Sequence, residues 1–184
     1  NPGEYLSDID DFVCDAKKGS VKIYFSSLVY TEIRQSALKE GGYDGVMAFF
    51  KDLGGSFIPV SPDPNVMIQA GELRNAPSFN PDPKASTTRV VGTADAIHLM
   101  TCLHIRDVYG VGDIVFHTFD KGRGATWEGK CIPLLGFERW YPEGKRTHSV
   151  DRVCGLFRSE PKYPQQRLFP ESKRGESAIS RRSP

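Results

Sequence analysis

The sequence lacks the features that would place it in a membrane, a secretory route or a zinc-binding class. No apolar run approaches the roughly 18–20 residues that a bilayer-spanning helix needs. The first residues contain neither a basic nor an apolar stretch, so they do not resemble a secretory signal. The four cysteines form no C-x-x-C pair, which argues against zinc ligation. We therefore expect a protein without a membrane partner, located in the cytoplasm.

A glycine-rich phosphate loop is missing too, which weighs against a nucleotide-binding protein. The short stretches GVGD and GRGA are not part of a strand–Gly-x-Gly-x-x-Gly–helix unit. The net charge of +1 conceals an asymmetry between the two ends of the chain. Residues 141–184 hold ten Lys and Arg against five Asp and Glu, whereas residues 1–140 hold 14 against 18. A basic end on an acidic body indicates a polyanionic partner.

Hydrophobic periodicity predicts alternating helices and strands, which is typical of an α/β fold with a mainly parallel sheet. We expect this domain to cover residues 1–140. The Pro-, Ser-, Lys- and Arg-rich residues 141–184 are expected to form an extended or disordered tail. The expected helices cover residues 4–18, 26–40, 43–55, 62–76 and 93–109, and the expected strands cover residues 21–25, 56–60, 113–118 and 130–140.

Three acidic residues should converge at one edge of this sheet. Glu32 and Asp95 lie in the first turns of helices, and Asp120 follows directly after a strand. In a parallel α/β sheet, the carboxyl ends of the strands and the N-terminal ends of the helices that follow them lie at the same edge, where ligands bind. Clustered carboxylates repel one another unless a cation is present. Mg²⁺ or Mn²⁺, which prefer carboxylate oxygens, would be the natural occupant.

A plainer interpretation of these acids stays open, because each could serve only as a helix-dipole or capping charge.

His98 lies three residues after Asp95 on the same helix face, and a hydrogen-bonded structural role is favoured over a catalytic one. The loop after Asp120 contains Lys121 and Arg123, which could hold a substrate phosphate or simply form an exposed turn.

The stretches FSSLVYTEI, TADAIHLMTCL and VFHTFDKG resemble three acidic motifs of PIN-domain ribonucleases and occur in the same order. The resemblance covers roughly residues 5–138. It implies a three-layer α/β/α sandwich with a central mainly parallel sheet. The implied activity is divalent-metal-dependent endoribonuclease cleavage of RNA, in some members as the toxin of a toxin–antitoxin pair. An antitoxin protein and a second copy of the chain are the partners that the resemblance implies.

Carried over to this sequence, the resemblance assigns Glu32, Asp95 and Asp120 as metal ligands and catalytic acids. It assigns Thr118 as the hydroxyl residue that hydrogen-bonds a carboxylate or water of the site. Ser27 is a candidate helix cap supporting the same edge.

One departure from the family is that its first strand, which ends in an aspartate, is absent from this sequence. Either the natural protein begins upstream, which is the interpretation that we favour, or it lacks that strand by nature. The alternative function is a non-catalytic PIN-like module that binds RNA or a protein.

Overall fold

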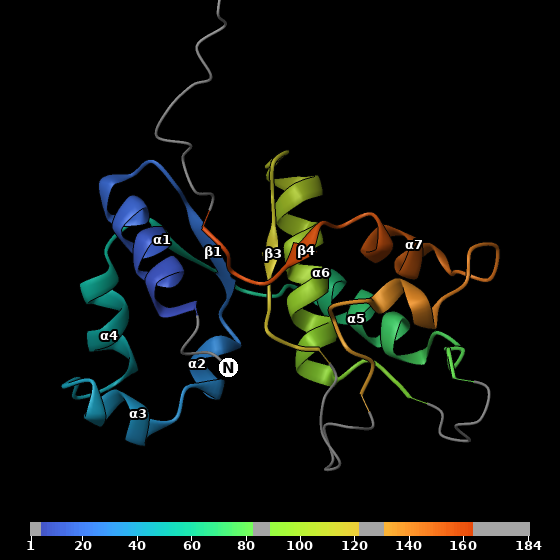
Figure 1. The fold of residues 1–184 in the computed structure, drawn as a ribbon, viewed down its shortest axis with the longest axis horizontal. Helices are drawn as coiled ribbons and strands as arrows, with labels where there is room; N and C mark the ends of the chain where they lie inside the picture. Colours follow the sequence, from blue (N-terminus) through green and yellow to red (C-terminus); the bar gives the residue numbers. More distant parts are fainter. Residues whose placement is uncertain (1–4, 83–88, 122–130, 164–184) are drawn as a thin grey trace, which may run out of the picture.

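The computed structural model describes residues 5–82, 89–121 and 131–163, which form a mixed α/β fold (Figure 1). The elements follow one another in an order that only partly matches the alternation expected from the sequence. They are α1 (Leu6–Lys18), β1 (Ile23–Ser26), α2 (Val29–Glu32), α3 (Gln35–Glu40), α4 (Val46–Leu53), β2 (Phe57–Val60), α5 (Pro64–Asn75), α6 (Thr93–Val108), β3 (Phe116–His117), the 3-10 helix η3 (Phe137–Trp140), α7 (His148–Cys154) and β4 (Arg158–Ser159).

Helices α1 and α5 begin and end where local sequence signals predict. α1 ends at Gly19, which adopts a left-handed conformation with φ of 79° and suits a residue without Cβ. α5 begins after Asp63, whose side chain accepts a hydrogen bond from the Val66 amide at 2.8 Å. Pro64 occupies the first helical position, where its missing amide costs nothing. The predictions for these two helices are confirmed.

The strands pair in parallel, as expected, but within the described residues they form two separate two-stranded sheets. β1 pairs with β2, with Ile23 opposite Phe57, and β3 pairs with β4, with Phe116 opposite Arg158. The strand expected over residues 113–118 is reduced to two residues. In Figure 1, β1 and β3 lie on either side of a gap, and both run toward the same edge of the molecule.

The hydrophobic core lies around α6 rather than in the sheets. α6 packs against α5, β1 and α7, which explains its long apolar face. The largest fully buried apolar side chains are Leu73, Val91, Leu99, Met100, Leu103, Ile132, Phe137, Tyr141, Val150 and Val153. None of the helices in the described part of the chain is long and apolar enough to cross a membrane.

The single helix expected over residues 26–40 is wrong. α2 ends at Glu32, and Ile33 and Arg34 adopt extended conformations with ψ of 121° and 130° before α3 begins. Contacts between α3 and α4 stabilise this break. Continuing the helix through two residues would contribute only roughly a few tenths of a kcal/mol per residue, which such packing outweighs.

The helix cap expected at Ser27 is also absent. Leu28 precedes α2, and no side chain caps that helix. The Ser27 amide instead donates to the Val60 carbonyl at 2.9 Å, extending the contact between β1 and β2. Ser27 therefore supports the carboxyl edge through its backbone.

The strand expected over residues 130–140 is wrong as well. Cys131 forms one parallel bridge with Val90, and the chain then turns into η3. Pro133 has no amide to donate to a sheet. Gly136 adopts a left-handed conformation with φ of 84°, which ends any extended run.

Residues 141–163 do not form the extended tail expected after Trp140. Thr147 caps α7, its hydroxyl accepting from the Val150 amide at 3.4 Å. The core includes side chains from this segment, and β4 pairs with β3. The polar composition of the segment conceals these buried apolar positions. The rest of the expected tail, residues 164–184, lies outside the described residues.

Candidate functional site

The three predicted acids come from separate segments and meet at the carboxyl edge of the strands. Glu32 is the last residue of α2, directly beyond β1. Asp95 lies in the first turn of α6, whose start is at the lower edge in Figure 1. Asp120 follows β3, which runs toward the same edge. The expectation of a shared edge, made from the parallel topology, agrees with the structure.

Asp95 is the central acid of this edge. Burial raises the pKa of its carboxyl above the ordinary value, and the negative charges of Asp120 and Glu32 raise that pKa further. His98 acts in the opposite direction and lowers the pKa of Asp95. Because Asp120, Glu32 and His98 all affect the pKa of Asp95, the four side chains share one electrostatic environment.

Glu32 is held in place by His98 from the next turn of α6. The Nε2 atom of His98 lies 2.9 Å from Oε2 of Glu32, joining residues 66 positions apart in the sequence. The His98 side chain is 18% exposed, whereas that of Glu32 is 44% exposed. His98 is therefore hydrogen-bonded, as the sequence favoured, and its partner fixes where the Glu32 carboxylate lies.

Asp120 is anchored by backbone groups on both sides. Its Oδ2 atom accepts a hydrogen bond from the Leu134 amide at 3.1 Å, and its carbonyl accepts from the Leu135 amide at 3.0 Å. The hydroxyl of Thr118 accepts from the Asp120 amide at 3.1 Å. Thr118 thus positions the backbone of Asp120.

Of the two basic residues predicted to hold a phosphate, Lys121 pairs with Glu160, the residue after β4. This pair ties the end of β3 to the segment that follows β4. Arg123 lies outside the described residues. The sequence did not indicate the contact with Glu160, because it joins segments that were expected to belong to different parts of the protein.

The edge that carries Glu32, Asp95 and Asp120, called the acidic edge below, has donor groups that suit a divalent cation. It does not form a finished metal site. Carboxylate oxygens are the ligands that Mg²⁺ and Mn²⁺ prefer, and a cation would relieve the repulsion that raises the pKa of Asp95. Within residues 5–82, 89–121 and 131–163, however, no three His, Cys, Asp or Glu side chains are arranged to hold a metal ion. Binding would require the carboxylates to move toward one another.

Gly92 is a residue of this edge that sequence reasoning missed. It precedes α6, and a Cβ atom at this position would overlap Oδ2 of Asp95 and lie 3.3 Å from its Cγ. Its φ of −57° is available to any residue, so the reason for glycine is the space that the Asp95 carboxylate occupies. The sequence signal that could have pointed to Gly92 is its position directly before the expected helix that begins TADA.

We expect Gly92→Ala to displace the Asp95 carboxylate while leaving the fold intact. The added methyl group forces the end of a short side chain to rotate, which costs about 1 kcal/mol. Apparent affinity for Mn²⁺ should fall, measured by calorimetric titration, with only a small change in melting temperature. Gly71→Ala in α5 is the matched control, because a Cβ atom added there would meet nothing within 4 Å. An unchanged Mn²⁺ affinity in Gly92→Ala would contradict this role.

Comparison with known proteins identifies no matching family model, no similar curated protein and no similar solved structure.

Proposed function

We propose that the protein is a divalent-metal-dependent endoribonuclease whose reaction takes place at the acidic edge. The observation that carries the proposal is that Glu32, Asp95 and Asp120, from three separate segments, lie together beyond parallel strands. Parallel topology brings these segments to one edge but does not require carboxylates there, and burial, followed by the negative charges of Asp120 and Glu32, raises the pKa of Asp95. A site with these properties suits phosphodiester hydrolysis, which develops negative charge that a cation must neutralise.

In this proposal Asp95, Asp120 and Glu32 hold Mg²⁺ or Mn²⁺. The bound ion would activate a water molecule and stabilise the developing negative charge on the phosphate. His98 keeps the Glu32 carboxylate at the edge through the 2.9 Å hydrogen bond. Thr118 fixes the backbone of Asp120. Lys121, next to Asp120, is available to a phosphate once it leaves Glu160.

The test is cleavage of a fluorescent single-stranded RNA with Mn²⁺ or with EDTA. We expect cleavage that requires Mn²⁺ and falls at least about 100-fold in Asp95→Asn, because removing one ligand charge weakens both cation binding and charge stabilisation. Asp10→Asn, an exposed acid on α1, is the matched control and should cleave normally. RNA binding without Mn²⁺-dependent cleavage would replace this proposal with a non-catalytic binding module.

Asp95→Asn should also stabilise the protein in EDTA at neutral pH. A carboxyl whose pKa is raised in the folded state contributes stability while protonated, and that contribution is lost as pH rises through the folded-state pKa. In the wild type this loss begins above the unfolded value near 3.8. Asparagine carries no charge, so the variant should lack this decline and gain about 1 kcal/mol, as active-site replacements often do. Denaturant unfolding at pH 4 and pH 7 measures the difference.

A further inference from the structure

Residues 158–163 link β3 to α1 (Figure 1). β4, which opens this segment, pairs in parallel with β3. Beyond β4, Pro161 lines the cavity of about 1000 Å³ that is also lined by α1, β1, α6 and β3. The segment then reaches α1, where the Tyr163 amide donates to Oδ1 of Asp8 at 3.0 Å. It is therefore held at both of its ends.

Tyr163 fastens the far end of this segment to α1 by its side chain as well. Its hydroxyl donates a hydrogen bond to the carboxylate of Asp15. Its ring packs edge-on against that of Phe12, with centroids 4.9 Å apart. Asp8 and Asp15 lie about two turns apart on α1, so the two hydrogen bonds fix Tyr163 along the helix. Glu160, three residues earlier, consequently has a defined place between β4 and α1.

The carboxylate of Glu160 lies among donors and positive charges from three parts of the chain. The ammonium group of Lys121, the residue that follows Asp120, forms an ion pair with it. The pKa of Glu160 lies below its ordinary value because Lys121 and Tyr5 donate hydrogen bonds to its carboxylate. The positive charges of Lys121 and Lys162 lower that pKa further. With its side chain only 17% exposed, Glu160 is less accessible to solvent than Lys121, at 45%.

A tight turn at Pro161 places Lys162 beside Glu160. The Lys162 amide donates to the Glu160 carbonyl at 2.8 Å, which is the hydrogen bond of a three-residue turn, and the fixed φ of proline suits the centre of such a turn. Nζ of Lys162 lies 6.0 Å from the centre of the Tyr5 ring. The same ring packs against Phe119, with centroids 5.3 Å apart. Tyr5 thus connects the turn to the end of β3.

The groups around Glu160 are the donor set of an anion-binding site. Two ammonium groups and a phenol hydroxyl suit a phosphate, because lysine binds phosphate as a point charge and needs no fixed planar geometry. Glu160 holds this position with a carboxylate of the same chain. Such a tethered group acts at an effective concentration on the order of millimolar, so a weakly bound free anion does not displace it. A polyanion with further contacts elsewhere on the surface can displace it.

We propose that the groups around Glu160 form a subsite for a backbone phosphate of single-stranded RNA, and that Glu160 occupies this subsite until RNA displaces it. The subsite, called the phosphate subsite below, consists of Lys121, Lys162 and Tyr5. The choice of RNA rests on the proposed function, because Lys121 directly follows Asp120 of the acidic edge. Rotation of the Glu160 side chain is enough to vacate the subsite, so β3 and β4 stay paired when RNA enters.

Binding of a fluorescently labelled single-stranded RNA, measured by anisotropy in EDTA, reports on this subsite without cleavage. We expect Glu160→Gln to bind RNA roughly fivefold more tightly than the wild type, because glutamine does not compete with phosphate for the two lysines. The slope of log K against log salt concentration should steepen by about 0.7, the change expected for one further neutralised phosphate. Glu72→Gln, which replaces an exposed acid of α5, is the matched control because it makes the same charge change. It should alter RNA affinity less than about twofold.

A double-variant cycle separates the phosphate subsite from a general effect of charge. In the wild type, Lys121 exchanges Glu160 for a phosphate, so Lys121→Ala should weaken RNA binding by less than about twofold. In the Glu160→Gln background, the same substitution should weaken binding roughly fivefold, because the lost contact with phosphate replaces no other contact. Lys162→Ala should show the same difference. Lys39→Ala, which removes an exposed lysine of α3, is the control and should have equal effects in both backgrounds.

Inorganic phosphate distinguishes RNA from a free phosphate as the ligand. At constant ionic strength, about 10 mM phosphate should compete with RNA in Glu160→Gln but not in the wild type, where the tethered carboxylate excludes it. Equal competition in both proteins would overturn the role of Glu160.

The proposal is also overturned if Glu160→Gln binds RNA no more tightly than Glu72→Gln, or if Lys121→Ala has the same effect in both backgrounds. Mn²⁺-dependent cleavage together with such a result would leave the proposed function in place. Tighter RNA binding by Glu160→Gln without cleavage by the wild type would retain the phosphate subsite and remove the nuclease.

Discussion

Deleting residues 141–184 is expected to abolish cooperative folding. The deletion removes α7, which packs against α5 and α6, and β4, which pairs with β3. Each fully buried side chain of this size contributes roughly 1.5–3 kcal/mol by its burial, and a domain of this size is stable by only about 5–15 kcal/mol. The buried side chains that the deletion removes are Tyr141, Val150, Val153 and Leu156.

Circular dichroism during thermal unfolding measures this effect. The truncated chain should show no sigmoidal transition, whereas the full protein should unfold in a single step. Deleting only residues 164–184 is the control, because it preserves every contact among the described residues. A cooperative transition retained after removal of residues 141–184 would show that the core does not need α7.

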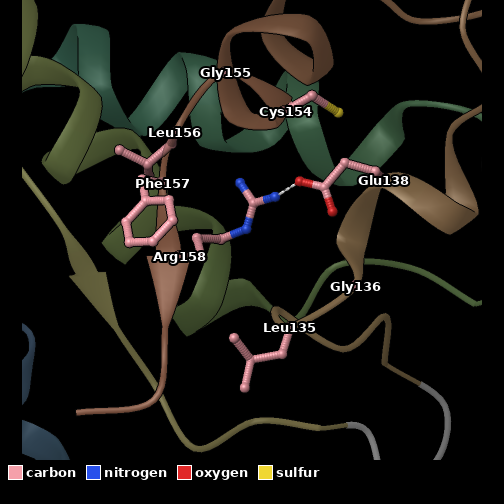
Figure 2. Close-up of a pocket in the computed structure, with 8 residues that line it drawn as sticks. All are labelled: Leu135, Gly136, Glu138, Cys154, Gly155, Leu156, Phe157 and Arg158. Carbon is pink, nitrogen blue, oxygen red and sulfur yellow. Dashed lines mark ion pairs between the residues drawn. The ribbon is translucent and has the colours of Figure 1, made fainter. Parts of the chain in front are cut away.

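We expect Arg158→Ala to destabilise the protein by about 3 kcal/mol. Arg158 is almost completely buried, with its side chain 4% exposed, and its guanidinium pairs with Glu138 (Figure 2). Its Nε donates to the Leu134 carbonyl at 3.1 Å, and another nitrogen donates to the Val153 carbonyl. Burial lowers the pKa of Arg158 to about 10, so it remains charged at neutral pH. Alanine leaves two buried carbonyls without their charged donor, each worth roughly 1.5–3 kcal/mol.

Two further variants show whether the backbone contacts or the ion pair dominate. Glu138 is 41% exposed, so Glu138→Gln should cost less than about 1 kcal/mol, as exposed ion pairs do. The loss of stability in Arg158→Lys should fall between the losses in Glu138→Gln and Arg158→Ala. Lysine keeps the charge but lacks the planar guanidinium group that reaches both carbonyls. Urea unfolding gives the three values. An equal loss in Glu138→Gln and Arg158→Ala would show that the ion pair is the main contribution.

The acidic edge and the hydrogen bond between Glu32 and His98 illustrate which features local sequence patterns predict and which they do not. The positions of Glu32, Asp95 and Asp120 follow from the order of strands and helices alone, because parallel topology places their segments at one edge. The hydrogen bond between Glu32 and His98 could not be predicted in the same way. It joins two residues 66 positions apart, and its formation depends on where the fold places α2 relative to α6.

The sequence by itself determined the elements whose signals are local: α1 with its terminal Gly19, α5 with its Asp63 cap, and the parallel pairing of short strands. Tertiary structure decided the elements whose stability comes from distant partners. Residues 33–34 break a helix because α3 packs on α4, and residues 141–163 are ordered because they cover α6. The cavity lined by α1, β1, α6 and β3 is likewise a property of packing, since these four elements are separate in the sequence.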